Sequence, residues 1–298
     1  IIFLLRRHIP IGPCMLAGGL LIWFVKTPEL SYLVRAFTET LSLSRTYDIL
    51  LALYFVMCLE IQLRTSGALE GMVKALQRIF SSAKFTLAIM PAFLGFLPSL
   101  GGARFSAPIV EEASKDTNIP QEHKAAINFW FRHIFEFSSP IIPGMIMACS
   151  IAGVPFSEFI KHLFWLTIVA FSVGWFILIR PIKIDVTKKA TTDNEETRKN
   201  KFDLVLSLAP VIITFLLVVL FNFNASLSMG VVTVGMYFVL KFTNRYVNLK
   251  EIILGACDYK MFLNVICILY FIQILTVTNV LNEIVVAFQN SPLPVPVI

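Results

Sequence analysis

Long apolar runs, separated by short charged connections, are the feature that most constrains the fold of this chain. Apolar residues make up 57% of the 298 residues and charged residues 15%. Soluble domains are typically about 45–50% apolar and about 25% charged. A bilayer core of about 30 Å requires roughly 20 apolar residues in each spanning helix. We therefore predict an all-α polytopic membrane protein with the lipid bilayer as a partner.

Eight segments are apolar enough to be membrane helices or parts of them. They are residues 9–25, 47–63, 85–97, 125–151, 162–179, 204–221, 226–240 and 261–277. The third is short and runs into the adjacent glycines Gly101 and Gly102. The fourth is long and contains Pro140 and Pro143, which predict a transmembrane helix broken at these prolines.

Basic residues predict which connections face the cytoplasm, because cytoplasmic loops are enriched in Lys and Arg. The connection 180–203 holds seven basic residues, and we place it in the cytoplasm together with 64–84 and 241–260. This topology is consistent only if residues 85–114 enter the membrane and return to the same side. The charge pattern therefore predicts a re-entrant helical hairpin at 85–114. The net charge of +6 then reflects topology, and we expect no nucleic-acid partner.

An internal repeat relates residues 47–77 to residues 259–289 at an offset of 212, with seven identities. In each copy an apolar stripe at helical spacing follows the span, which predicts an amphipathic helix in the membrane interface. The predicted topology makes the two copies inverted. Inverted repeats with segments interrupted by Gly or Pro indicate a secondary transporter.

The repeat divides the chain into five parts. They are N-terminal spans in 1–45, with the first span cut; a first repeat in 46–180, with the hairpin at 85–114 and the broken helix at 125–153; a cytoplasmic loop at 181–203; linking spans in 204–258; and the incomplete start of a second inverted repeat in 259–298. We expect the sequence to be truncated at both ends, with the second hairpin beyond residue 298.

The first candidate site is the turn of the predicted hairpin, which carries Ser99, Gly101, Gly102, Arg104 and Ser106. Adjacent glycines allow a tight turn with positive φ and a close approach of the backbone. Ser106 is expected to cap a helix that the following proline helps to start. The free N–H groups of that start, with Arg104, would suit a carboxylate or another anion. The alternative is an ordinary glycine-rich turn at the membrane interface.

The second candidate site lies in the predicted broken helix. Asn128, Arg132 and Glu136 are spaced i, i+4, i+8 and would share one face of a helix, with His133 beside it. Burying a charged residue at the bilayer centre costs about 2.5–3.5 kcal/mol, which pairing of Arg132 with Glu136 would partly offset. We predict that Asn128 and Arg132 line a cavity and that His133 or Glu136 binds a coupling ion. The alternative is a solvated interfacial helix.

Three further features predict structure rather than chemistry. Glu60 lies four residues before Arg64, which favours an ion pair along one helix. Glu111 and Glu112 are expected near a helix start, where negative charge is favourable. The five cysteines form no CxxC pair, so we expect neither a disulfide framework nor a metal site. We expect no cofactor other than a transported or coupling Na⁺ or H⁺.

Two stretches carry a resemblance to a known family. LPSLGGARFSAPIVEEA and INFWFRHIFEFSSPIIPG, in this order, resemble the membrane-protein family called domain of unknown function 401. That family is grouped with the ion transporter superfamily, alongside gluconate, citrate and C4-dicarboxylate permeases. The resemblance covers essentially the whole chain. It implies paired re-entrant hairpins, inverted repeats, a homodimer and elevator-type alternating access in the plasma membrane of a prokaryote. It names no substrate.

We therefore expect a secondary active transporter of a small anion such as a carboxylate, coupled to Na⁺ or H⁺, and not an enzyme. A cation/proton antiporter on the same scaffold is the first alternative. An intramembrane hydrolase that uses Ser106 and His133 is a second alternative, but the chain has no GxSxG-type nucleophile motif.

Overall fold

The computed structural model describes residues 2–79, 82–96, 103–115, 117–139, 145, 149, 153–182 and 194–289. All regular secondary structure within these residues is helical, so the predicted all-α fold is confirmed. The chain divides into two compact units. The terminal unit combines Ile1–Leu50 with Asp258–Ile298, and the central unit is Leu51–Cys257.

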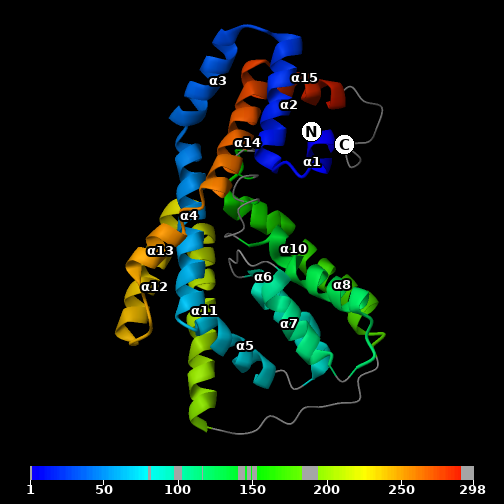
Figure 1. The fold of residues 1–298 in the computed structure, drawn as a ribbon, viewed down its shortest axis with the longest axis vertical. Helices are drawn as coiled ribbons and strands as arrows, with labels where there is room; N and C mark the ends of the chain where they lie inside the picture. Colours follow the sequence, from blue (N-terminus) through cyan, green and yellow to red (C-terminus); the bar gives the residue numbers. More distant parts are fainter. Residues whose placement is uncertain are drawn as a thin grey trace. The chain divides into compact units, whose positions relative to one another are not determined.

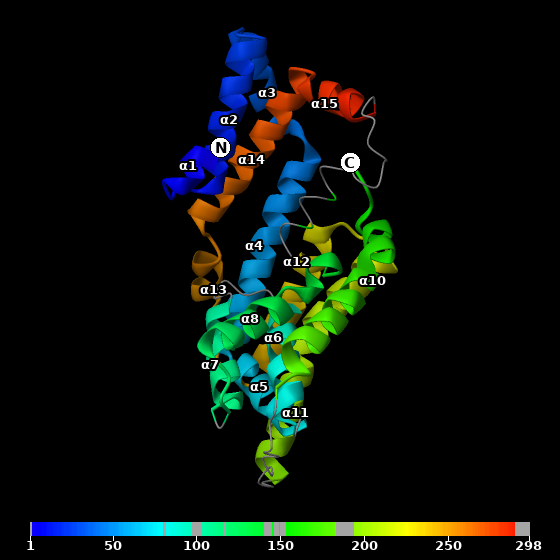
Figure 2. The same ribbon diagram turned by 90° about the vertical axis from the view of Figure 1, so that its right-hand side faces the viewer.

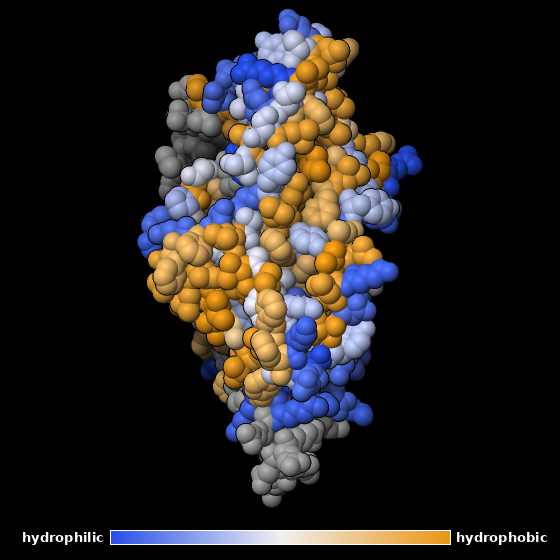
Figure 3. Space-filling model, turned by 90° about the vertical axis from the view of Figure 1, so that its left-hand side faces the viewer, coloured by the Kyte–Doolittle hydropathy of each residue, from blue (hydrophilic) through white to orange (hydrophobic). Residues whose placement is uncertain are grey.

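The part of the chain that the structure describes contains five helical segments long and apolar enough to cross a membrane. They are Ser44–Thr65, Ser157–Ile179, Lys201–Val219, Ala225–Phe242 and Leu249–Val277. Each overlaps one of the predicted apolar segments. Apolar side chains also cover much of the face in Figure 3, as expected for a surface in contact with lipid. The chain is therefore an all-helical membrane protein, as predicted.

The terminal unit is built around the packing of α2 on α14 (Figure 1). Its helices are α1 (Ile2–Arg6), α2 (Ile11–Lys26), α3 (Leu30–Ser42), the start of α4 (Ser44–Thr65), α14 (Tyr259–Val277) and α15 (Val280–Gln289). The backbone N–H of Gly12 donates to Asn264 Oδ1 at 3.1 Å. A Cβ on Gly12 would lie 2.6 Å from the Cα of Asn264, so only glycine allows this approach.

Helix α3 is not predicted by the apolar pattern, because Arg35 and Glu39 interrupt its apolar residues. It packs against α14. The Glu39 carboxylate accepts hydrogen bonds from Arg35 Nε, at 2.7 Å, and from the side chain of Gln273 on α14. The Arg35 hydrogen bond holds the pKa of Glu39 below its usual range.

The central unit holds the remaining helices (Figure 2). They are most of α4, α5 (Ala68–Ile79), α6 (Ala83–Phe96), α7 (Ala103–Ala113), α8 (Gln121–Arg132), the 3₁₀ turn η1 (Ile134–Phe137), α10 (Phe156–Gly174), the π turn η2 (Trp175–Ile179), α11 (Asn194–Val219), α12 (Ala225–Phe242) and α13 (Leu249–Gly255).

Two buried apolar clusters hold the central unit together, and α6 contributes to both. The first joins Met90 and Leu94 of α6 to residues of α4, α5, α11 and α12. The second joins Leu87, Ala88 and Ala92 of α6 to residues of α7, α8, η1 and η2. Along its backbone α6 lies closest to α7 and α8. Helix α6 is therefore the common wall between the two clusters.

Two predictions for this unit are corrected. Helix α5 forms at the amphipathic stripe, as predicted, but Met72 and Leu76 pack into the first cluster instead of lying in the membrane interface. Its Gly71 lies directly against Asp203, which lets α5 approach α11 closely. Helix α11 begins at Asn194, so the last part of the predicted loop 181–203 is helical.

Candidate functional site

Helices α6 and α7 pack against each other and form a helical hairpin at the predicted place. At a rise of 1.5 Å per residue, helices of 14 and 11 residues are about 21 and about 16 Å long, which is less than a bilayer core of about 30 Å. Ser99, Gly101 and Gly102, which belong to the predicted site, lie in the connection 97–102, outside the described residues.

The start of α7 differs from the prediction. The helix begins at Ala103, so Ser106 lies inside its first turns and is fully buried, rather than capping it. Pro108 lies inside the helix. Arg104 is in the first turn, although its side chain is outside the described part. The first four N–H groups of an α-helix have no partner within the helix, and here they belong to residues 103–106. The predicted anion-binding end of the helix is therefore at Ala103.

Helix α8 ends at Arg132, eight residues before the predicted break at Pro140. A 3₁₀ turn follows from Ile134 to Phe137. Side chains three residues apart are eclipsed in a 3₁₀ turn, and here His133 Nδ1 lies 2.5 Å from Glu136 Oε1. This side-chain contact accompanies the change from α-helix to 3₁₀ turn. Pro140 and Pro143 lie outside the described residues.

The early break separates residues that were predicted to share a face. Glu136 contacts His133 and not Arg132, so the predicted Arg132–Glu136 pair is wrong. The side chains of His133 and Glu136 are 39% and 47% exposed, whereas Arg132 is 7% exposed. The candidate site therefore consists of a buried part with Asn128 and Arg132, and an exposed part with His133 and Glu136.

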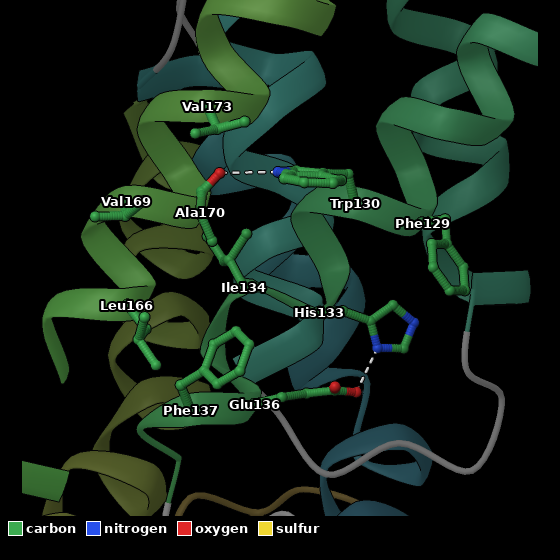
Figure 4. Close-up of a pocket in the computed structure, with 10 residues that line it drawn as sticks. All are labelled: Phe129, Trp130, His133, Ile134, Glu136, Phe137, Leu166, Val169, Ala170 and Val173. Carbon is green, nitrogen blue, oxygen red and sulfur yellow. Dashed lines mark hydrogen bonds and ion pairs between the residues drawn. The ribbon is translucent and has the colours of Figure 1, made fainter. Parts of the chain in front are cut away.

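The exposed part is a groove of about 390 Å³ between α10 and the segment formed by α8 and η1 (Figure 4). His133 and Glu136 are its charged or titratable residues. The others are Phe129, Trp130, Ile134, Phe137, Leu166, Val169, Ala170 and Val173. Trp130 Nε1 donates to the carbonyl oxygen of Ala170 at 2.8 Å and fixes one wall. The groove is thus mainly an apolar surface with one His–Glu pair.

The buried part lies at the end of the hairpin. A Cβ on Gly95, in the last turn of α6, would lie 1.8 Å from the carbonyl oxygen of Arg132. The end of α8 therefore abuts the end of α6 that leads into the connection 97–102. Asn128, one turn earlier on α8, is also buried. The structure thus brings the second sequence motif to the end of the hairpin that carries the first.

One donor of the Arg132 guanidinium group has no acceptor within the described part of the chain. Its Nη1 is buried and has no hydrogen-bond partner among the residues that the structure describes. A buried donor without an acceptor costs about 1–3 kcal/mol, and more when the group is charged. An anion with two oxygens could accept hydrogen bonds from such a group in a bidentate arrangement.

Glu60 is a residue of this region that was predicted only as the partner of Arg64. Glu60 is 3% exposed on α4, whereas Arg64 lies at the surface. Glu60 interacts electrostatically with Arg132. Glu60 and Arg132 are thus two buried charged residues of the central unit. The signal in the sequence is a carboxylate inside an otherwise apolar span, between Leu59 and Ile61.

Glu111 and Glu112 lie in the last turn of α7, not near a helix start as predicted. Negative charge is unfavourable at this end of a helix, so a different interaction is needed. Lys124 of α8 supplies it for Glu111, with Nζ 2.9 Å from Oε1. This ion pair ties α7 to α8.

Three segments predicted to be cytoplasmic meet at one buried ion pair. Asp203 of α11 pairs with Arg245, which follows α12. Arg245 Nη1 also donates to the carbonyl oxygen of Ser66, between α4 and α5, at 3.3 Å. Asp203 belongs to the connection 180–203, Arg245 to 241–260 and Ser66 to 64–84. The three connections therefore lie close together at this ion pair.

The described residues contain no group of three or more His, Cys, Asp or Glu side chains that could hold a metal ion. All five cysteines are free thiols, and four of them are buried. The chemistry that the site offers is therefore that of a buried arginine, an acid and a helix start.

Comparison with known proteins gives one family. A family model described as "Protein of unknown function (DUF401)" matches residues 15–298, nearly the whole chain. Comparison with curated proteins gives no match.

Proposed function

We propose that this chain, which belongs to the DUF401 family of proteins of unknown function, is a secondary active transporter of a small anion such as a carboxylate. The proposal includes coupling to Na⁺ or H⁺. It rests on one observation above all: a buried arginine, whose Nη1 has no hydrogen-bond partner among the described residues, lies at the end of a helical hairpin in a membrane protein.

The proposed substrate site combines the end of α8 with the tip of the hairpin. Arg132 supplies positive charge and hydrogen-bond donors, and Asn128 on the same helix supplies a polar amide. The N–H groups at the start of α7, with Arg104, would bind the other end of the anion. The proposed site also includes the other residues that the sequence predicted for the hairpin end: Ser99, Gly101, Gly102 and Ser106.

The short hairpin supports the transport mechanism. Two helices shorter than the bilayer core fit a re-entrant hairpin better than two complete crossings. Irregular backbone at the depth of the membrane is tolerated where it faces protein or a watery cavity, as in transporters. We propose, by resemblance, that the family belongs to the ion transporter superfamily and works as a homodimer by elevator-type alternating access between inverted repeats in the plasma membrane.

The burial of Glu60 favours a second candidate function, a cation/proton antiporter on the same scaffold. A carboxylate inside a candidate membrane span is a site where a cation and a proton could compete. A hydrolase is less favoured, because Ser106 is fully buried while His133 is exposed in the groove beside α10.

Uptake by the full-length protein in proteoliposomes tests these functions. The probes are radiolabelled succinate, citrate and gluconate, each with an inward Na⁺ or H⁺ gradient. We expect Arg132→Ala to reduce uptake of the transported probe about tenfold or more, because losing a hydrogen bond to a charged group costs about 1.5–3 kcal/mol. Arg64→Ala, at an exposed arginine, is the matched control and should leave uptake unchanged.

Two results would count against the proposal. Wild-type rates in Arg132→Ala would show that the buried guanidinium does not bind the anion. Exchange of Na⁺ for H⁺ by the wild type, without uptake of any of the three probes, would identify the antiporter instead.

A further inference from the structure

We infer that the groove between α10 and the segment formed by α8 and η1 binds an aromatic organic cation that enters from the lipid, with the Glu136 carboxylate as its counter-charge. The inference goes beyond the proposed transport of an anion and does not depend on it. It concerns the exposed part of the candidate site, whereas the proposed anion lies with Arg132 in the buried part.

The groove has the size and the lining of a small-molecule site. Its volume of about 390 Å³ lies within the range of about 300–1,000 Å³ that is usual for ligand pockets. Trp130, Ile134 and Phe137 are turned toward α10 and form one wall (Figure 4). Helix α10 forms the other wall, with Leu166 and Val173 among its residues. Such pockets are typically apolar, with a few polar groups that fix the orientation of the ligand.

The polar groups of this groove are His133 and Glu136, at its rim. Both side chains lie on the side of η1 that points away from α10 (Figure 4). His133 Nδ1 occupies one oxygen of the Glu136 carboxylate, Oε1, at 2.5 Å, which leaves Oε2 for a ligand. The Glu136 side chain is 47% exposed, so a ligand in the groove can reach it.

The lining favours an organic cation over a metal ion. Hard metal ions such as Ca²⁺ take several oxygen ligands, whereas the groove offers a single carboxylate. The faces of aromatic rings attract organic cations, and Phe129, Trp130 and Phe137 all line the groove. An organic cation also has apolar surface to bury against the aliphatic side chains of α10.

The groove lies on a helix that faces lipid. Ser157–Ile179 is the least buried of the five candidate spans found in the described residues. Large apolar side chains along it are exposed, namely Phe164, Trp165, Ile168, Phe176 and Ile177. Leu166 and Val173 lie within this span, so the groove is at the depth of the membrane. A carboxylate at this depth is unfavourable without a counter-charge, and an amphipathic cation dissolved in the bilayer would supply one.

The neighbouring charges are compatible with a bound cation. Arg132, next to His133 in the chain, is only 7% exposed and belongs to the buried part of the site. The charged or titratable residues of α10 are Glu158, Lys161 and His162, which lie in its first two turns and do not line the groove. A neutral His133 that donates its Nδ1 proton leaves the rim pair with one negative charge, which a monovalent cation balances.

Binding of a fluorescent aromatic cation to the full-length protein in lipid nanodiscs tests the site. The probe is dimethylaminostyryl-methylpyridinium, and its control is dimethylaminostilbene, which has a similar aromatic frame and no charge. Nanodiscs of zwitterionic lipid without protein give the signal from partitioning into lipid. After this correction, we expect the wild type to bind the cation at least fivefold more tightly than the neutral probe, because the carboxylate and the aromatic faces act on its charge.

Three variants locate the binding. Glu136→Gln removes the charge and keeps the shape, so it should weaken cation binding at least fivefold and leave binding of the neutral probe within about twofold. Glu158→Gln is the matched control, since this carboxylate of α10 is 48% exposed and lies outside the groove, and it should bind both probes like the wild type. Val173→Trp, at a position that is 37% exposed, fills part of the groove and should weaken both probes at least fivefold.

Several results would overturn the inference. Equal affinity of the wild type for the two probes would show that charge plays no part. Unchanged cation binding in Glu136→Gln or in Val173→Trp would show that the dye binds elsewhere. Loss of both probes in Glu136→Gln would show that this residue shapes the groove and is not a counter-charge. The measurement needs no transport, so a protein that takes up none of the anions would fail the proposed function and leave this inference standing.

Discussion

A single added methyl group on Gly95 tests whether the end of the hairpin lies against the end of α8. In Gly95→Ala the new Cβ would lie 1.8 Å from the carbonyl oxygen of Arg132 and 2.9 Å from its Cα. Real Cβ atoms keep at least 3.0 Å from other heavy atoms, so the two helices must separate by about 1.2 Å at this point. The obstructing atoms belong to the backbone and cannot rotate away, as a side chain could.

Two effects of this substitution oppose each other. Overpacking a well-filled interior costs about 1–3 kcal/mol. Alanine in place of glycine within a helix gains up to about 1 kcal/mol. Because the contact is with the backbone, we expect overpacking to dominate, with a net loss of about 1–2 kcal/mol. A domain of about 150–250 residues loses about 2–4 °C in Tm for each kcal/mol, so Tm should fall by about 2–8 °C.

The assay is thermal unfolding of the purified full-length protein in detergent, followed by tryptophan fluorescence. Gly235→Ala is the matched control, since a Cβ on this glycine of α12 would meet nothing within 4 Å. The control should keep or slightly raise Tm, because only the helix-propensity term acts. Uptake of the transported probe should fall in Gly95→Ala alone, since Arg132 is displaced with its backbone. Equal Tm values for the two variants would refute the close approach of α6 and α8.

Three further predictions concern other parts of the chain. Asp203→Asn should lower the free energy of unfolding by about 1.5–3 kcal/mol, because it removes a charged hydrogen-bond acceptor from the partly buried Arg245 guanidinium; chemical denaturation measures this, and a loss below about 1 kcal/mol would contradict it. Glu39 has a pKa lowered by Arg35, so its contribution to stability is complete above its unfolded-state pKa and is lost as the pH falls through its folded-state pKa. Glu39→Gln should therefore lose less Tm than the wild type between about pH 6 and about pH 3, and an identical loss would refute the interaction. Cys257 is the exposed cysteine, so a membrane-impermeant maleimide should label it in permeabilised cells but not in intact ones if 241–260 is cytoplasmic; labelling of intact cells would reverse the topology.

The positions of the long helices could be predicted from the sequence, because the length and polarity of an apolar run follow directly from the solvent that surrounds it. The helical hairpin could also be predicted, because its two short helices flank the adjacent glycines Gly101 and Gly102 in the sequence. Helix α3 could not, since its Arg35 and Glu39 hide the apolar face that packs on α14.

The geometry of the candidate site could not be predicted, because it depends on interactions between segments that are distant in the sequence. The predicted pairing of Arg132 with Glu136 assumed that the α-helix continues through both residues. Instead, a 3₁₀ turn follows Arg132 and changes the direction of the side chains, and Glu136 contacts His133. The relation between Glu60 and Arg132 joins residues 72 positions apart and has no local pattern. Prolines are visible helix breakers in a sequence, whereas the close approach of Gly95 to the end of α8 is not visible there.

Helix α6 contributes side chains to both apolar clusters, so it lies at the boundary between two groups of helices. Its backbone lies closest to α7 and α8, and its boundary with α4, α5, α11 and α12 runs through Met90 and Leu94. Methionine is unbranched and polarisable, and it can fit against more than one neighbouring surface. A sliding motion along this boundary would carry the end of α8, with Arg132, together with α6, because Gly95 lies directly against the backbone of Arg132.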